Sequence, residues 1–148
     1  MPRLRSDGSI QSIYKFVPGK RVVRPLIGAK VPAGFPSPAQ DYIEGLLDLN
    51  EHLIQHQAAT FFMYADGYSM SGAGINPGDL LIVDRAIEPV SNKIVVAIVD
   101  GELTLKRLII DREQYYLVPE NQDYQPIVIT EDMSFSIWGV VTFVIHPL

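Results

Sequence analysis

Residues 94–110 read IVVAIVDGELTLKRLII, two runs of β-branched and aliphatic residues separated by Asp100-Gly101. Such residues favour strands, and an Asp-Gly pair between two such runs is typical of a tight hairpin turn. Five further strand-like segments surround this hairpin: Thr60–Ala65, Leu80–Asp84, Tyr115–Val118, Ile127–Ile129 and Phe135–Ile145. Seven short strands separated by turn residues predict a mainly β fold, a small twisted antiparallel β-domain or partly closed barrel.

The chain before residue 60 lacks these regular strand-like runs. Residues 34–38 read Gly-Phe-Pro-Ser-Pro, which cannot be helical throughout and which marks the clearest boundary in the sequence. Residues 39–49 carry apolar side chains at roughly helical spacing, so we expect a helix there, with Ser37 as its N-cap. Residues 50–56 are expected to form a second short helix. We therefore divide the chain into an arm (1–33), a linker with short helices (34–59) and a β-rich domain (60–148).

Composition limits the classes of protein to consider. The chain has 148 residues, of which 47% are hydrophobic and 20% charged, as in ordinary globular domains. It has no cysteine, which excludes disulfides, thiol catalysis and thiolate metal sites. No apolar run reaches the ~18 residues that span a bilayer, and the first residues lack the apolar core of a signal peptide. We expect a cytoplasmic protein.

The net charge of −5 hides an uneven distribution. Residues 1–33 carry seven basic residues against the single acid Asp7, a balance of +6. Residues 34–148 carry five basic and sixteen acidic residues, a balance of −11. A basic arm lying on a body of opposite charge explains this split, and an arm that contacts nucleic acid is the alternative.

The sequence gives little indication that its histidines bind a metal or take part in catalysis. His52 and His56 are four residues apart, but a metalloprotease helix needs Glu directly after the first His, where this chain has Leu53. We interpret the pair as a solvated surface feature. We expect His146 to lie in the last strand with no obvious partner, and we expect no metal site.

Two other features invite a chemical interpretation. Residues 67–79 form a Gly-rich loop between two strands, with Ser69 near its start. The structural alternative is a loop whose glycines adopt positive φ angles. Lys106 interrupts an otherwise apolar strand, and the structural alternative is an edge strand whose charges prevent aggregation.

Together these features resemble the LexA/UmuD self-cleaving serine proteases. The pattern Gly-x-Ser-Met-x-x-x-Gly-Ile-x-x-Gly-Asp runs from Gly67 to Asp79, and Lys106 follows Ser69 by 37 residues. The UmuD branch is indicated by residues 33–39, which are similar to its cleavage region. Asp48-Leu49-Asn50, residues 78–84 and residues 99–102 are also similar, so the resemblance covers roughly residues 33–145.

Three departures from the family pattern stand out. Tyr68 occupies a position where UmuD-type proteins often have Asp, although that position varies. Pro32 precedes the expected scissile residue and restricts how the segment docks. The arm is longer than is typical of the branch.

The resemblance implies a LexA/signal-peptidase-like β fold with a short helix and an extended N-terminal arm. It implies a serine endopeptidase in which Ser69 is the nucleophile and Lys106 the general base, without a cofactor. The backbone amides of Tyr68 and Ser69 would stabilise the oxyanion, and the chain would cut itself between Ala33 and Gly34. A lysine acts as a base only when neutral, and burial favours the neutral form over an ordinary pKa of about 10.4.

The resemblance also implies partners and a pathway. Cleavage would be stimulated by RecA filaments on single-stranded DNA and would remove residues 1–33. The shortened homodimer would then serve as the accessory subunit of an error-prone, UmuC-type Y-family DNA polymerase in SOS mutagenesis, with the replicative sliding clamp as a further partner. Residues 60–148 would form the catalytic and dimerisation domain.

Three alternatives remain from other classes. A LexA-like transcriptional regulator needs a helix-turn-helix module, which 33 breaker-rich residues do not accommodate. A signal peptidase acting in trans shares the catalytic pair but needs a membrane anchor. A non-catalytic β-domain that binds partners has no need of a cleavage site, so the Ala33-Gly34 match disfavours it.

Overall fold

The computed structural model describes residues 5–27 and 43–148. It divides the chain into two compact units, a larger one of Met1–Val17 with His56–Leu148 and a smaller one of Pro18–Gln55. The predicted boundary at residues 34–38, the Ser37 N-cap and the cleavage site at Ala33 and Gly34 lie outside the described residues.

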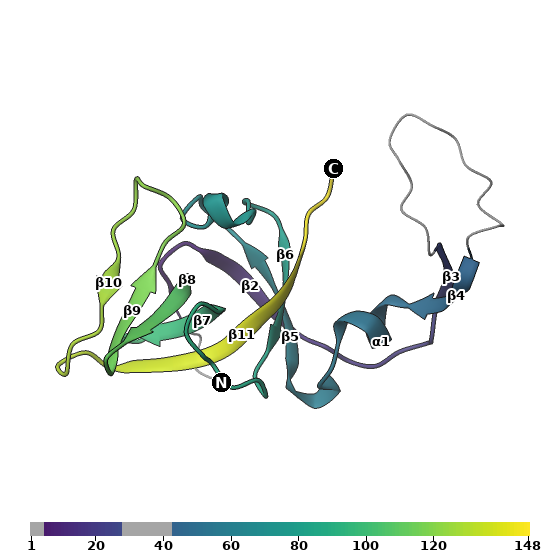
Figure 1. Ribbon diagram of the computed structural model, residues 1–148, viewed down its shortest axis with the longest axis horizontal. Coiled ribbons are helices and arrows are strands. Elements are labelled where there is room, and N and C mark those ends of the chain that lie inside the picture. Colours follow the sequence, from purple (N-terminus) through teal and green to yellow (C-terminus); the bar gives the residue numbers. More distant parts are fainter. Residues whose placement is uncertain (1–4, 28–42) are drawn as a thin grey trace. The chain divides into compact units, whose positions relative to one another are not determined.

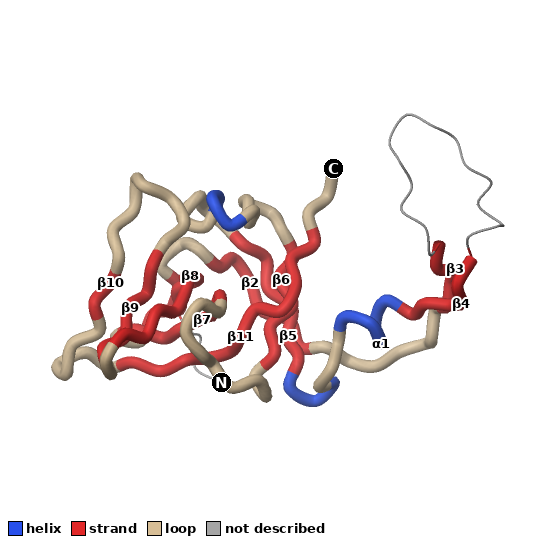
Figure 2. The backbone as a smooth tube through the Cα atoms, in the orientation of Figure 1, coloured by secondary structure: helices blue, strands red, loops and turns tan. Residues whose placement is uncertain are grey.

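The larger unit is built on one curled sheet (Figures 1 and 2). Within the described residues its nine strands are β1 (Arg5–Ser6), β2 (Ile10–Lys15), β5 (Thr60–Ala65), β6 (Leu80–Asp84), β7 (Ile94–Val99), β8 (Glu102–Asp111), β9 (Gln114–Val118), β10 (Ile127–Val128) and β11 (Phe135–Ile145). Their order is β10-β9-β8-β7-β11-β6-β5-β2, all antiparallel, and β1 adds to β8 in parallel. The mainly β prediction is therefore confirmed.

The predicted hairpin at the centre of this sheet is confirmed. Residues of β7 and β8 pair in antiparallel register, with Val95 opposite Lys106. Asp100 and Gly101 have φ angles of 48° and 82°. Both lie in the left-handed region that a two-residue hairpin loop with the twist of the strands requires.

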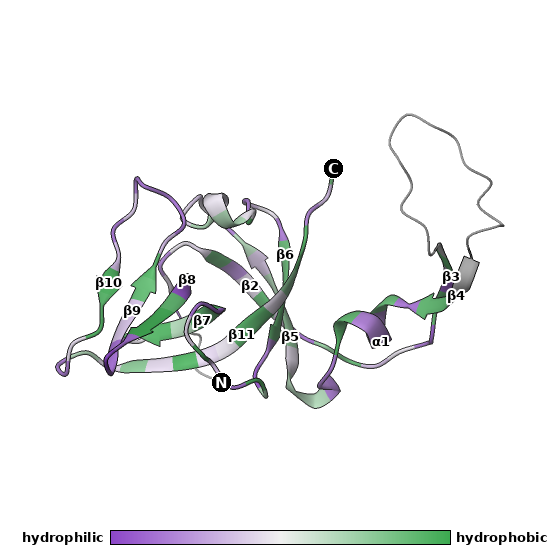
Figure 3. Cartoon of the chain, in the orientation of Figure 1, coloured by the Kyte–Doolittle hydropathy of each residue, from purple (hydrophilic) through white to green (hydrophobic). Residues whose placement is uncertain are grey.

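The core explains why the central strands read as continuous apolar runs. Val95, Val96 and Ala97 are all fully buried, because both faces of β7 are covered. Two clusters result, one around Met63, Leu81 and Val83, and the other around Val95, Ala97, Leu108, Leu117 and Val140. Figure 3 colours many residues of the same strands as hydrophobic. Each such burial stabilises the fold by about 1.5–3 kcal/mol.

Two N-terminal strands were not predicted. β2 pairs with β5, with Ile13 opposite Met63, while β1 pairs with β8. Three strands separate β5 from β8 in the sheet order, so the sheet curls enough for one short segment to reach both. Ile10 and Phe16 are buried, which anchors the segment by apolar packing as well as by backbone pairing.

The expected single arm of residues 1–33 is therefore divided differently in the structure. Its first part belongs to the larger unit, and β3 (Val23–Ile27) belongs to the smaller one. The arm was expected to lie on the body through opposite charge. Backbone pairing to β5 and β8 holds its first part instead.

The smaller unit corrects one helix prediction. Residues 43–48, expected to be helical, form β4 (Ile43–Asp48), which pairs with β3. Gly45 disfavours a helix by ~1 kcal/mol, and an isolated helix of that length is marginal in water. The second predicted helix is present but shorter, as α1 (Leu49–Leu53), with Asp48 as its N-cap.

No helix in the described ranges is long and apolar enough to cross a membrane.

Candidate active site

Ser69 sits on a loop that the core and a neighbouring segment hold from two sides. It precedes a short 3₁₀ turn, η3 (Ser71–Ala73), and only 6% of it is exposed. Met70 and Ile75 on the same loop are each 2% exposed and belong to the core cluster. The Ser69 carbonyl accepts a hydrogen bond from the Glu120 amide at 2.8 Å. The conspicuous apolar residues of the Gly67–Asp79 pattern thus position the loop, while Ser69 supplies a reactive hydroxyl.

Backbone geometry next to Ser69 favours the predicted oxyanion site. The Tyr68 carbonyl accepts from the Ser71 amide at 3.1 Å and from Asn121 Nδ2 at 2.8 Å, which fixes that peptide plane. In a trans peptide the Ser69 N–H points the opposite way from this carbonyl. Within the described residues, neither the Tyr68 nor the Ser69 amide donates a hydrogen bond. Both donors therefore remain for a developing negative charge.

Lys106 occupies an interior strand. β8 lies between β7 and β9, and 5% of Lys106 is exposed. The interpretation of an edge strand carrying protective charges is therefore wrong. Its Nζ donates to Thr104 Oγ1 at 2.9 Å and to the Leu105 carbonyl at 3.2 Å.

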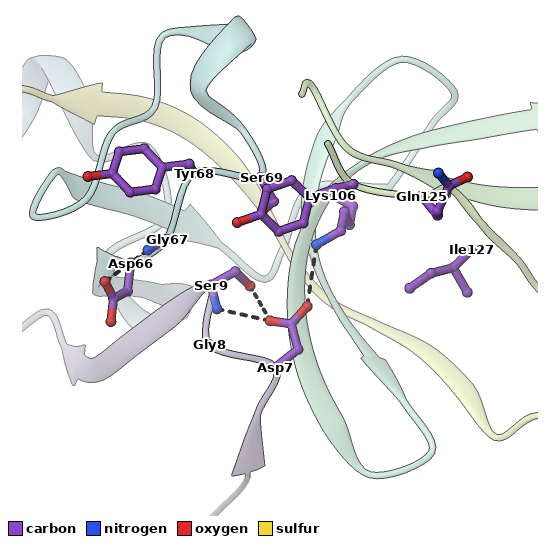
Figure 4. A pocket seen from close by; sticks show the side chains of 11 residues that line it. Asp7, Gly8, Ser9, Asp66, Gly67, Tyr68, Ser69, Lys106, Gln125 and Ile127 are labelled. Carbon is purple, nitrogen blue, oxygen red and sulfur yellow. Dashed lines mark hydrogen bonds and ion pairs between the residues drawn. The ribbon is translucent and has the colours of Figure 1, made fainter. Parts of the chain in front are cut away.

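The structure brings the two predicted catalytic residues together. Ser69 and Lys106 line the same pocket of 260 Å³, together with Tyr68 and residues of the N-terminal segment (Figure 4). Neither strand pairing nor sequence proximity links them, because they lie 37 residues apart on different elements. The catalytic roles of these residues stay predictions.

The N-terminal segment contributes an acid to this pocket that sequence reasoning did not select. Asp7 Oδ2 lies 3.3 Å from Lys106 Nζ and accepts from Thr104 Oγ1 at 2.6 Å. Asp7 Oδ1 accepts from the Ser9 amide at 3.0 Å and the Ser9 hydroxyl at 2.5 Å. Burial raises the pKa of Asp7, but the hydrogen bonds from Ser9 and Thr104 and the Lys106 charge outweigh it and hold that pKa below 3.8. One signal was available, since Asp7 is the only acid in the first 33 residues.

Two histidines have buried acidic partners that the sequence did not indicate, although the histidine side chains are themselves 47% and 51% exposed. His56 Nδ1 lies 2.6 Å from Asp84 Oδ2, and His146 Nδ1 lies 2.5 Å from Asp79 Oδ1. Asp84 and Asp79 are 2% and 0% exposed. A carboxylate buried to this degree is costly unless it is paired, so these histidines serve the fold. Across the described parts of the chain, no group of three or more His, Cys, Asp or Glu side chains is placed to hold a metal.

His146→Ala is expected to lower the free energy of unfolding by about 1–3 kcal/mol at pH 7, because among the described residues the buried Asp79 carboxylate then keeps only the hydrogen bond from the Asn76 amide. Burial raises the pKa of Asp79, but the Asn76 amide and His146 outweigh it and hold that pKa below 3.8. The stabilisation is therefore present above pH 3.8 and is lost as the pH falls through the lowered pKa. Urea unfolding at pH 7 and at pH 3 measures this. Equal stability of the two proteins at pH 7 would contradict it.

Comparison with known proteins identifies related chains. Residues 25–142 match the Peptidase S24-like family. The chain is 47% identical to the protein ImpA of Salmonella typhimurium over 125 residues, 84% of each chain. It is 48% identical to the protein SamA of Salmonella typhimurium over 122 residues, 82% of this chain and 84% of that one. It is 42% identical to the protein MucA of Escherichia coli over 122 residues, 80% of this chain and 83% of that one. These matches confirm the resemblance to UmuD-like proteins.

Proposed function

Because the chain belongs to the Peptidase S24-like family, we propose that it is a serine endopeptidase that cuts its own chain between Ala33 and Gly34. The observation that carries the proposal is the meeting of two buried residues, Ser69 and Lys106, in one pocket. A buried lysine that shares a pocket with a serine on a tightly held loop can act as its general base once the amine is neutral and within hydrogen-bond reach of the hydroxyl.

The proposed reaction has two stages. Neutral Lys106 takes the proton of Ser69 as Oγ attacks the Ala33 carbonyl carbon, and the amides of Tyr68 and Ser69 stabilise the oxyanion. Lys106 then gives that proton to the Gly34 nitrogen as the peptide bond breaks, which leaves Ala33 joined to Ser69 as an ester. Lys106 takes a proton from a water molecule as that water attacks the ester, and it then returns the proton to Ser69 Oγ as the ester bond breaks, which restores Ser69 and neutral Lys106. The products are residues 1–33 and residues 34–148.

The proposed biological role follows from the similarity to UmuD-like proteins. Cleavage responds to RecA filaments on single-stranded DNA in the cytoplasm. The shortened homodimer then supports a UmuC-type Y-family polymerase in SOS mutagenesis, with the sliding clamp as a further partner. The described residues 5–27 form the strands β1, β2 and β3 and no helix-turn-helix module, so they do not favour a LexA-like regulator.

Incubating the purified protein with RecA, ATP and single-stranded DNA, or alone at alkaline pH, is expected to yield a fragment that begins at Gly34. Alkaline pH favours cleavage because it increases the neutral fraction of Lys106. Mass spectrometry and N-terminal sequencing identify the bond. A fragment that begins elsewhere, or no fragment under either condition, would overturn the proposed cleavage site or the proposed activity.

A further inference from the structure

The amine of Lys106 is directed away from the reaction that it is proposed to catalyse. Its hydrogen-bond and ion-pair partners in the described residues are Asp7, Thr104 and the Leu105 carbonyl. Ser69 is not among them, and its Oγ makes no hydrogen bond to any described residue. Figure 4 shows the Lys106 nitrogen pointing at the Asp7 carboxylate.

The contact with Asp7 favours the charged form of the amine. An opposite charge at 3.3 Å stabilises an ammonium group over a neutral amine. The two side chains are 6% and 30% exposed, so solvent screens the pair less than it would a surface pair. The other titratable groups that line the pocket, Asp66, Tyr68 and Tyr124, have no ion pair with Lys106.

The segment that carries Asp7 bridges the two halves of the site. The Asp7 amide donates to the Leu103 carbonyl on β8 at 3.0 Å, and the Leu105 amide donates to Ser9 Oγ at 2.9 Å. On the other side, the Asp66 amide, three residues before Ser69, donates to the Ser9 carbonyl at 2.9 Å. The segment therefore contacts both the strand of the base and the loop of the nucleophile.

We propose that residues 5–9 are an autoinhibitory latch, in which Asp7 holds Lys106 as an ammonium ion and thereby keeps the peptidase inactive until the segment leaves β8. This inference rests on the proposed role of Lys106 as a base. β1 pairs with β8 over two residues, so local opening of this short strand needs little disruption of the sheet. Opening removes the carboxylate and with it the negative charge that favours the ammonium form.

The Asp7 carboxylate keeps its charge at neutral and alkaline pH. The pKa of Asp7 is below 3.8, so its carboxylate stays ionised at every higher pH. Protonation of Asp7 weakens the latch only as the pH falls through that lowered pKa, where Lys106 is charged in any case. The segment lies upstream of Gly34, so the latch belongs to the part of the chain that cleavage separates from residues 34–148.

The test uses Asp7→Asn, which keeps the shape of the side chain and an oxygen to accept from Ser9. Asp111→Asn is the matched control, because this substitution removes the same charge from an exposed residue at the far end of β8. In the latch interpretation, Asp7→Asn cleaves itself roughly tenfold faster than the wild type near pH 7 and equally fast at a pH where Lys106 is neutral in both. The cleavage rate of Asp111→Asn is expected to depend on pH in the same way as that of the wild type. Slower cleavage of Asp7→Asn at every pH, or an unchanged profile, would overturn the latch.

A second measurement is independent of activity. The chain has five lysines, so lysine labelled with ¹³C at Cε gives a spectrum in which Lys106 can be assigned by substitution. In a Ser69→Ala background, Asp7→Asn is expected to lower the pH midpoint of the Lys106 resonance by about one unit, a tenfold change. An unchanged midpoint would overturn the latch. If the midpoint shifts but no variant ever cleaves, the latch stands and the proposed peptidase activity fails.

Discussion

Ser69→Ala is expected to reduce self-cleavage by about 10³-fold or more, because it removes the only atom proposed to attack the Ala33 carbonyl. The change should leave the fold intact. Ser69 Oγ has no hydrogen bond to any residue in the described ranges, so its removal leaves no polar group unpaired. Cleavage is followed by mass spectrometry and folding by thermal unfolding. Ser136→Ala, on the exposed side of β11, is the matched control and should cleave at the wild-type rate.

Lys106 needs two variants to separate its roles in chemistry and in folding. Lys106→Ala should be equally inactive but also less stable by about 1–3 kcal/mol, since Asp7 and Thr104 lose a buried donor. Lys106→Arg retains a positive charge to pair with Asp7, but a guanidinium does not become neutral in proteins. It should therefore be inactive while staying closer to the wild type in stability. Cleavage of the same bond by either variant would contradict the mechanism.

The strands after residue 60 were predictable because each apolar run ends at a turn residue. β5, β6 and β11 begin and end at the predicted residues, and the other four each differ by one residue at one end. These runs are buried on one or both faces, so hydrophobicity alone marks them. The N-terminal strands β1 and β2 are not marked by such hydrophobic runs. β2 becomes a strand through its pairing with β5, while the surrounding glycines, prolines and charges indicate a loop.

The same distinction applies to the site. The resemblance identified Ser69 and Lys106, and the spacing of the pattern placed them on a loop and a strand. The pattern did not indicate which side chain contacts Lys106. Asp7 is 99 residues away in the sequence, and the curl of the sheet brings the two side chains together. The sequence shows Asp7 as the single acid in a basic segment. Its position beside Lys106 could be known only from the fold.

Gly72→Ala is expected to reduce self-cleavage by about 10²-fold, because it disturbs the contact that sets Ser69 relative to Lys106. A Cβ on Gly72 would lie 2.5 Å from the Glu120 carbonyl oxygen and 3.3 Å from the carbonyl carbon. Both are backbone atoms, so no side-chain rotation relieves the clash. The same backbone carries the amide that binds the Ser69 carbonyl, and the Glu120 side chain pairs with Arg107, next to Lys106 on β8. A shift of about 1 Å in a reacting group is enough for an effect of this size.

The stability of Gly72→Ala separates this interpretation from simple unfolding. Gly72 has no positive φ, so the substitution adds a clash without backbone strain, and the loop can move outward while the core stays packed. We therefore expect a larger loss in cleavage rate than in unfolding free energy, measured on the same preparation by mass spectrometry and urea unfolding. Gly19→Ala is the control, because its Cβ would meet no atom within 4 Å and its φ is ordinary. Wild-type cleavage by Gly72→Ala would mean that Glu120 does not set the position of Ser69.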